Sequence, residues 1–477
     1  MDYDVIVIGT GFASSFFLKR FLELRGSQDR ILVLERGPLR THAERLAARL
    51  DDRGDENIER STDFYRGEGL ATKSWNFSIG FGGSSNCWWG NTPRFLPADF
   101  AIASRFGQGR DWPIGYDEIE PYYSQAEQIM EISGSDENHL HPRSAPYPLP
   151  AHNLSDPETV LRQAYPDRYF AMPTARASRT TQTRARCCAN DVCSMCPVNA
   201  KFTIENGLGG VYREPNVTLV GGALVHSIET RGGQVTGVEY THDGQQKRAG
   251  GAMVVLGANA LFNPVILGNS GMDHPLLGKR LHEQYGLLGD AYLDGMDSFQ
   301  GSTSVTGIGY MLWDDEERRR TLAPALLETK SVGFMRLEPG RWRQVLPVRL
   351  VYEDIPSDEN FVVSDPDDRD KPVARFTGYS DYVKRSAERA VADMEKILAP
   401  LPVERIELRE ASTEAHIQGT TVMGDDPADS IVDAGNLHHR YRNLVVLGSS
   451  VFPSCSPANP TLTIAALSLR AAEKLVA

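Results

Sequence analysis

Four of the chain's six cysteines lie in one short segment, 186–197, which reads RCCANDVCSMCP. Two cysteines that are adjacent in sequence seldom bond to each other, and a cytoplasmic protein keeps its thiols reduced, so disulfides are disfavoured. Structural zinc usually needs two separated cysteine pairs, whereas this segment holds one C-x-x-C pair. Several thiolates within a short span, closed by Cys-Pro, favour an iron–sulfur cluster, with buried thiols, zinc and disulfides as alternatives. The candidate ligands are Cys187, Cys188, Cys193 and Cys196.

A second group of residues suited to catalysis lies near the C-terminus. The segment AHIQGTTVMG contains His416, and the segment SCSPANPTLT contains Asn459. An imidazole titrates near neutral pH and therefore suits general-base catalysis. Asn459 is expected at the N-cap of a helix whose first residue is Pro460, where the missing N–H costs nothing. The positive end of that helix would favour negative charge on a bound ligand.

A glycine turn at the N-terminus predicts a dinucleotide site. In GTGFAS, Gly9, Gly11 and Ser14 occupy the G-x-G-x-x-G/A positions, between the strand YDVIVI and an expected helix. The next expected strand, RILVLE, ends at Glu35, where an acidic residue meets ribose hydroxyls in such sites. The motif alone does not choose between NAD and FAD.

Composition sets broader bounds. The chain has 477 residues with 41% hydrophobic residues and a net charge of −13, which argues against nucleic-acid binding. No apolar run approaches the roughly 18 residues of a membrane span. Because the first strand begins at Tyr3, no signal peptide is expected, and the cytoplasm is the expected compartment.

These segments together resemble the glucose–methanol–choline (GMC) oxidoreductases, a family of FAD-dependent alcohol oxidases and dehydrogenases. The matching pieces are the N-terminal GTGFAS…LERG, GGSSNCWWGNTPRF, VVLGANALFNPVILGNSG, H-x-x-G-T-x-x-M and N-P-T-L-T. The resemblance implies that His416 takes the substrate's hydroxyl proton while hydride goes to the flavin, and that Asn459 binds the same oxygen. It also implies FAD contacts at Gly82, Gly83, Ser85, Asn86, Cys87, Gly257, Asn459 and Pro460.

The form of the GGSS loop is similar to that of the sugar-oxidising branch of the family. Cys87 stands where a histidine tethers the flavin in some members, so a covalent bond stays open beside the expected non-covalent FAD. A subset of sugar dehydrogenases carries a cysteine run like this one with a [3Fe–4S] cluster; because the fourth cysteine is displaced here, [3Fe–4S] and [4Fe–4S] both stay open. His282 and Gln284 lie in a segment, GKRLHEQYG, where the family often has a histidine.

The resemblance implies an FAD-dependent dehydrogenase that acts on a sugar or amino sugar and passes electrons through the cluster to a protein or small carrier. The alternatives are an oxidase that reduces O₂ and a flavin-bound electron-transfer subunit without its own substrate. The acidic balance made an amino sugar, such as an aminoglycoside, one reasonable substrate beside a neutral hexose.

The expected fold is α/β, with a discontinuous Rossmann-like FAD-binding domain and an α+β substrate domain built on an antiparallel sheet. The segments STSVTGIGYMLW, KSVGFMRL, VLPVRLVYE and NFVVSD predict the strands of that sheet. We expect the FAD-binding domain to comprise 1–110, 200–280 and 420–477. The substrate domain would comprise 111–199 and 281–419 and carry the cysteine segment.

Overall fold

The computed structural model describes residues 2–50, 61–331 and 336–476. The N-terminal β-α-β unit forms as predicted, through β1 (Tyr3–Ile8), α1 (Phe12–Arg25) and β2 (Ile31–Leu34). The strands β1 and β2 are parallel and in register from Val5 opposite Ile31. Their apolar residues are buried on both faces, as a parallel strand between two covering layers requires.

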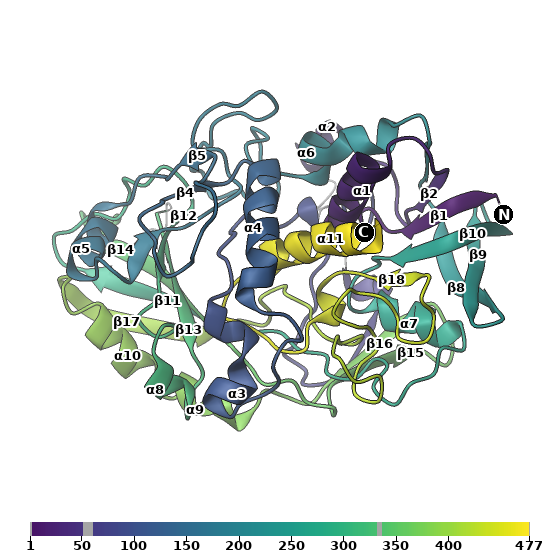
Figure 1. The fold of residues 1–477 in the computed structure, drawn as a ribbon. Coiled ribbons are helices and arrows are strands. Elements are labelled where there is room, and N and C mark those ends of the chain that lie inside the picture. Colours follow the sequence, from purple (N-terminus) through teal and green to yellow (C-terminus); the bar gives the residue numbers. More distant parts are fainter. Residues whose placement is uncertain (1, 51–60, 332–335, 477) are drawn as a thin grey trace.

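These strands belong to a seven-stranded mixed sheet at one end of the molecule (Figure 1). Its order is β7 (Val217–Val220), β2, β1, β10 (Gln245–Leu256), β9 (Gln234–His242) and β8 (Leu224–Arg231), with β18 (Leu444–Val446) also paired to β10. The long strand β10 joins two halves, because its second half runs parallel to β1 and β18 and its first half pairs antiparallel with β9. Segments from both ends of the chain thus meet in one sheet.

A six-stranded, wholly antiparallel sheet forms the other end of the molecule (Figure 1). Its order is β17 (Val403–Glu410), β11 (Tyr285–Leu293), β14 (Val345–Tyr352), β13 (Ala325–Lys330), β12 (Val305–Gly309) and β6 (Tyr169–Ala171). The predicted antiparallel sheet is therefore confirmed, and the two sheets together confirm the expected α/β class. Half of the predicted strand KSVGFMRL, residues 332–335, lies outside the described residues, and its first residue, Lys330, ends β13.

One predicted strand of that sheet pairs elsewhere. NFVVSD forms β15 (Phe361–Ser364), which makes a hairpin with β16 (Pro372–Phe376), and β16 runs parallel to β3 (Arg66–Gly69). Because β15 forms its strand hydrogen bonds with β16 in this hairpin, β15 does not join the larger sheet. A final pair comprises β4 (Ser133–Gly134) and β5 (Leu149–Pro150).

Helices cover and connect the two sheets. The helix α11 (Thr461–Val476) lies between α1 and α4 (Tyr116–Met130) and packs against both (Figure 1). The others are α2 (His42–Leu50), α3 (Ile102–Phe106), α5 (Asp156–Ala164), α6 (Ile204–Leu208), α7 (Phe262–Asn269), α8 (Glu316–Arg319), α9 (Asp381–Ala387) and α10 (Ala390–Ile397). Short 3-10 helices span Ser61–Phe64, Gly83–Ser85, Pro97–Phe100, Gly209–Arg213 and Ser449–Val451. Within the described ranges, no helix has both the length and the apolar character needed to cross a bilayer.

The start of α11 differs from the prediction by one residue. The amide of Ile464 donates to the carbonyl of Pro460, so Pro460 is the N-cap and the helix begins at Thr461. Asn459 stands one position before the cap, and its side chain is free of any capping role. Its amide is therefore available to the cavity described below.

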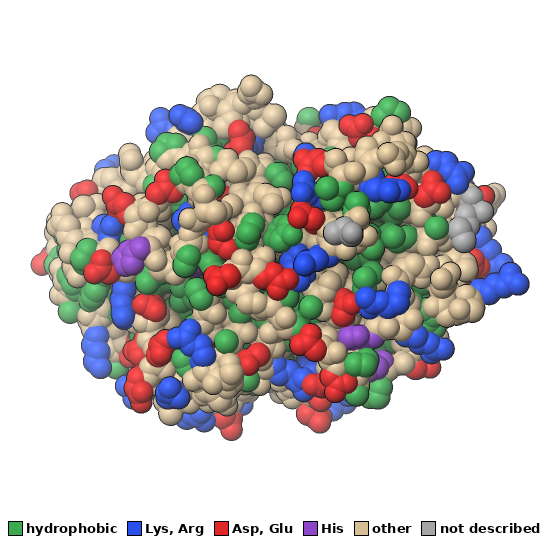
Figure 2. All heavy atoms as spheres, viewed as in Figure 1, with side chains coloured by type: hydrophobic (Ala, Val, Ile, Leu, Met, Phe, Trp, Pro, Cys, Tyr) green, Lys and Arg blue, Asp and Glu red, His purple; other side chains and the backbone are tan. Residues whose placement is uncertain are grey.

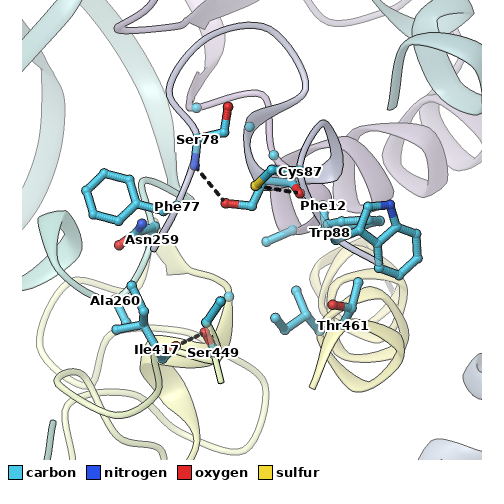
Figure 3. Close-up of a pocket in the computed structure, with 18 of the residues that line it drawn as sticks. Phe12, Phe77, Ser78, Cys87, Trp88, Asn259, Ala260, Ile417, Ser449 and Thr461 are labelled. Atoms are coloured by element: carbon cyan, nitrogen blue, oxygen red, sulfur yellow. Dashed lines mark hydrogen bonds between the residues drawn. The ribbon is translucent and has the colours of Figure 1, made fainter. Parts of the chain in front are cut away.

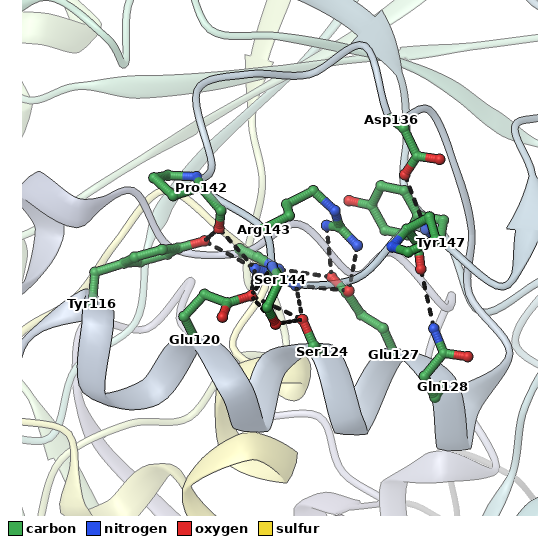
Figure 4. Close-up of polar contacts among 12 residues, drawn as sticks. Tyr116, Glu120, Ser124, Glu127, Gln128, Asp136, Pro142, Arg143, Ser144 and Tyr147 are labelled. Atoms are coloured by element: carbon green, nitrogen blue, oxygen red, sulfur yellow. Dashed lines mark hydrogen bonds and ion pairs between the residues drawn. The ribbon is translucent and has the colours of Figure 1, made fainter.

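A buried ionic network fixes the loop 136–147 onto α4 (Figure 4). Glu127 accepts two hydrogen bonds of 2.8 Å from the Arg94 guanidinium and two, of 3.1 and 2.5 Å, from Arg143. The side chains of Glu127 and Arg94 are essentially inaccessible to solvent. Burying two guanidinium groups is costly unless they are paired; Glu127 compensates both, and Glu120 adds a second contact to Arg94, at 3.0 Å.

We expect Glu127→Gln to lower the free energy of unfolding by about 3–5 kcal/mol, because it removes the carboxylate paired with the buried Arg143 and leaves the buried Arg94 with Glu120 alone. Glu137→Gln is the matched control: Glu137 pairs with Arg162 but is 72% exposed, so it contributes little. Denaturant unfolding of the two variants tests this, and equal losses would show that the Glu127 network is not energetically distinct.

Candidate active site

A cavity of about 390 Å³ extends from the glycine turn after β1 to the segment that carries His416. Figure 3 shows residues from several parts of the chain around it: Phe77 and Ser78, Cys87 and Trp88, Asn259 and Ala260, Ile417, and Ser449. Thr461, the first residue of α11, also borders it. The cavity thus lies between the N-terminal turn and the C-terminal segments singled out in the sequence.

The glycine turn is shaped for a close approach between backbones. Gly9 has φ +91°, and a Cβ there would lie 2.6 Å from the carbonyl oxygen of Gly257. Gly11 is the N-cap of α1 and lines the cavity. No protein atom lies within 4 Å of the position that a Cβ at Gly11 would take, so the residue faces open space. The N-terminus of α1 therefore opens onto the cavity, as a pyrophosphate site requires.

Glu35 holds this turn together with two other loops. Its carboxylate accepts from the amide and hydroxyl of Thr10, at 3.1 and 2.6 Å, and from the amides of Gly37 and Gly80, at 2.9 and 3.2 Å. Burial nevertheless raises the pKa of Glu35. Glu35 lines the cavity, and its contact with ribose hydroxyls stays a prediction.

The residues that the FAD prediction names divide into two groups. Gly9, Gly11, Glu35, Gly83, Cys87, Gly257, Asn459 and Pro460 line the cavity. Ser14, Gly82, Ser85 and Asn86 lie behind its wall and bond within the protein: Ser14 donates to the Ile8 carbonyl, and the Ser85 hydroxyl accepts from the Ile204 amide. The cavity-lining group borders open space, at Gly11 in particular, where a side chain would intrude; its contact with FAD stays a prediction.

His416 and Asn459 meet at the other end of the cavity. Asn459 Nδ2 lies 3.4 Å from His416 Nε2, and Asn459 Oδ1 is buried without a partner among the described residues. On the far side of the ring, His416 Nδ1 lies 3.2 Å from Gln284 Oε1. The two residues separated by 43 positions in sequence are therefore in direct contact.

Gln284 determines which ring nitrogen of His416 carries the proton. The Gln284 amide donates to the carbonyls of Ser456 and Ala458, at 2.8 and 2.9 Å, so its oxygen must face the ring. An oxygen that only accepts requires N–H at Nδ1 of His416. This assignment leaves Nε2 unprotonated and directed at Asn459, the tautomer that a general base needs.

The surroundings also keep His416 neutral. Burial, together with the positive charges of Arg349 and Lys73, lowers its pKa to about 3. Arg349 itself is paired with Glu414 through a bidentate contact of 3.1 and 2.8 Å. The imidazole is therefore unprotonated across the physiological pH range.

A buried ion pair supports the segment that carries His416. Glu283 accepts from the backbone amides of His416 and Glu414, at 3.1 and 3.3 Å, and pairs closely with Lys73. Both side chains of the pair are almost wholly buried, and the Lys73 ammonium lies 4.4 Å from the centre of the Trp75 ring. Neither this pair nor Gln284 was predicted to support His416, because an isolated lysine, glutamate or glutamine carries no motif.

The four cysteines of the predicted cluster are free thiols and are not arranged to hold a metal ion. Cys193 Sγ lies 3.0 Å from the Ser304 hydroxyl, Cys187 Sγ lies 3.4 Å from the Thr303 hydroxyl, and Cys188 is exposed. Within the described ranges, no group of three or more His, Cys, Asp or Glu side chains is placed to hold a metal ion. The ligand set as it stands does not fit a cluster.

The cysteine segment is nevertheless anchored beside the cavity. The buried Lys201 ammonium donates to the carbonyls of Asn86 and Trp88 in the cavity loop, at 3.0 and 2.7 Å. It also donates to the carbonyl of Cys193, at 2.8 Å. Burial lowers the pKa of Lys201 to about 8. Lys201 thus links the loop and the cysteine segment directly.

Comparison with known proteins gives one consistent result. The family model described as GMC oxidoreductase matches residues 4–286 in its N-terminal part and 356–468 in its C-terminal part. The fructose dehydrogenase large subunit of Gluconobacter japonicus is 29% identical over 83% of this chain and 80% of its own length. The 6'''-hydroxyparomomycin C oxidase of Streptomyces lividus is 26% identical over 98% of this chain and 90% of its own. The crystal structure of pyridoxine 4-oxidase from Mesorbium loti shares the fold, with a TM-score of 0.70, 18% identity and coverage of 99% and 98%.

We expect Gly11→Ala to weaken FAD binding without destabilising the protein, because the added methyl group meets no protein atom but enters the cavity at the mouth of α1. Gly115→Ala is the matched control, since Gly115 also caps a helix and also has open space around it. Released FAD per chain and the melting temperature of the apoprotein measure the two effects. Full FAD content in Gly11→Ala would contradict the placement of the cofactor.

Proposed function

This chain belongs to the GMC oxidoreductase family, and from that membership we propose that it is an FAD-dependent dehydrogenase that oxidises a hydroxyl group of a sugar or sugar-derived compound. Oxidation of CH–OH groups with FAD is the activity of the family. The observation that carries the proposal for this chain is the contact between His416 Nε2 and Asn459, at the end of the cavity opposite the glycine turn. Bound FAD would supply the hydride acceptor.

We propose that His416 is the general base. Its unprotonated Nε2 faces the cavity and would accept the proton of a substrate hydroxyl, while Gln284 keeps the other nitrogen protonated. The long 3.4 Å contact with Asn459 leaves room for an oxygen to form better hydrogen bonds with both residues. In that arrangement Asn459 Nδ2 donates to the substrate oxygen and holds it as the proton leaves.

The related proteins bear on the substrate. The names of two relatives refer to fructose and to a paromomycin derivative, which are a sugar and an aminoglycoside. They also divide between a dehydrogenase and an oxidase, so the electron acceptor needs its own experiment.

We further propose that the chain divides into an FAD-binding domain at 1–110, 200–280 and 420–477 and a substrate domain at 111–199 and 281–419. We also propose a cytoplasmic location.

His416→Ala should lower the rate of flavin reduction by sugar about 10²–10⁴-fold, the usual contribution of a general base. The exposed His139, replaced by alanine, is the control and should leave the rate unchanged. Anaerobic stopped-flow absorbance of the holoenzyme measures both. An unchanged rate in His416→Ala would show that His416 is not the base, and absence of flavin reduction by sugar in the wild-type protein would favour the alternative of an electron-transfer subunit without its own substrate.

The pH profile provides a separate prediction. A base must be unprotonated, and the pKa of His416 is lowered from its usual 6.5 to about 3. The value of kcat/KM should therefore not decline through protonation of His416 between pH 8 and pH 5. A tenfold fall per pH unit beginning near pH 6.5 would show that the ring titrates normally and is not enclosed as described.

We retain the iron–sulfur cluster as a proposal, because four thiols lie within ten residues and Lys201 ties their segment to the cavity loop. Its formation would require the segment to rearrange. Anaerobically purified protein should then contain about three or four iron atoms per chain. Cys193→Ser should lose them, whereas Cys455→Ser, outside the segment, should retain them.

The same preparation distinguishes dehydrogenase from oxidase. A dehydrogenase reduces an artificial dye with sugar and forms little hydrogen peroxide in air. Absence of iron together with one peroxide per sugar oxidised would establish the oxidase alternative and leave the cysteines as structural thiols.

A further inference from the structure

The cavity wall near His416 includes two side chains of β13 that project from the same face of the strand. Glu328 and Lys330 are two residues apart, so they point in the same direction, and both line the cavity. The residue paired with Glu328 on the neighbouring strand is Arg349, which also lines it. The six-stranded sheet thus contributes charged groups to the same space as His416 and Asn459.

Glu328 retains an unused acceptor. The residue is 3% exposed, and its Oε1 accepts from Asn91 Nδ2 at 2.9 Å. Within the described ranges no hydrogen bond or ion pair engages its second oxygen. Asn91 also lines the cavity, and its Oδ1 is buried without a partner there. The unpartnered amide oxygen of Asn91 is costly unless a ligand satisfies it, and the second oxygen of Glu328 is in the cavity lining, where a ligand can reach it.

Lys330 offers a matching donor. Its ammonium lies 4.3 Å from the centre of the Trp89 ring, and no carboxylate of the described residues pairs with it. Burial lowers its pKa, while the charges of Asp191 and Glu328 oppose that effect. The Lys330 ammonium and the second oxygen of Glu328 provide a hydrogen-bond donor and an acceptor on the same wall of the cavity, next to the Trp89 ring. Hydroxyl groups, which both donate and accept, can satisfy such a pair.

The charges at and beside this wall balance. Arg349 is neutralised by Glu414 in a bidentate pair, and Lys330 offsets Glu328. The nearby Asp191 is offset by Arg176. The net charge of −13 is therefore not concentrated at the cavity, and Figure 2 shows acidic and basic side chains interspersed over the outer face as well. A cationic ligand gains no surplus negative charge here, so the overall acidity gives no reason to expect an amino sugar.

We propose that Glu328, Lys330 and Asn91 form the subsite for the hydroxyl groups beside the oxidised carbon, and that the subsite selects a neutral polyhydroxylated ring over an amino sugar. This inference rests on the proposed function and narrows its substrate class. It assigns the choice of substrate to β13 and the loop at Asn91, whereas the oxidation itself depends on His416 and Asn459.

Binding to His416→Ala holoenzyme tests the subsite separately from turnover. The probes are D-glucose, D-mannose and D-galactose, each paired with its 2-amino-2-deoxy analogue, titrated by calorimetry. At least one neutral sugar should bind about tenfold or more tightly than its amino analogue, and Glu328→Gln should reduce that affinity about tenfold. Tighter binding of the amino sugars, or no binding of any neutral probe, would overturn the inference.

Lys330→Gln gives a charge-specific readout that a loss of packing would not mimic. It leaves Glu328 unbalanced, so the ratio of amino-sugar to neutral-sugar affinity should rise about tenfold or more, with melting temperature unchanged. Lys279→Gln is the matched control, because Lys279 also lies over an aromatic ring, at 4.4 Å from the centre of Phe361, but does not line the cavity. An unchanged ratio in Lys330→Gln would overturn the inference. Failure of wild-type protein to reduce its flavin with any bound sugar would instead contradict the proposed function alone.

Discussion

The cofactor end of the cavity depends on one buried carboxylate. Glu35 receives hydrogen bonds from Thr10, Gly37 and Gly80, which belong to three loops that have no strand pairing with one another. The Thr10 hydroxyl in turn accepts from the Gly82 amide at 3.1 Å, which extends the arrangement into the loop that carries Cys87. Because an ionised group in the interior is tolerated only when its oxygens are satisfied, the positions of these loops and the charge state of Glu35 are coupled.

The sequence predicted the parts of the site that depend on residues close together in the chain. The turn from Gly9 to Ser14 lies between a strand and a helix because two glycines permit the tight turn, and the strand–helix order follows from the hydrophobic pattern. His416 and Asn459 were expected at one site through family resemblance, and the structure brings them into contact. The helix boundary at Pro460 was one residue off, since the proline carbonyl and not the Asn459 side chain completes the first turn.

Other parts of the site depend on contacts between distant segments and leave no pattern in the sequence. Gln284 orients His416 only because α11 is preceded by the carbonyls of Ser456 and Ala458, which fix its amide. Glu328 and Arg349 become neighbours through the register of β13 and β14, which hydrophobic alternation does not specify. The cysteine spacing indicated a cluster, yet no three side chains of the His, Cys, Asp and Glu type among the described residues are placed to hold a metal ion, and Cys187 and Cys193 contact the hydroxyls of Thr303 and Ser304 instead.

The ion pair of Lys73 and Glu283 lies behind the base, on the side away from the cavity, and holds the backbone of His416 and Glu414 from there. The side chains that face the substrate on β13 take no part in that support. Chemistry and selectivity are therefore anchored in different places in this protein. An altered recognition surface can evolve, or be engineered, on β13 while the proton acceptor keeps its geometry, which is how one scaffold can serve many alcohols without rebuilding its reactive centre.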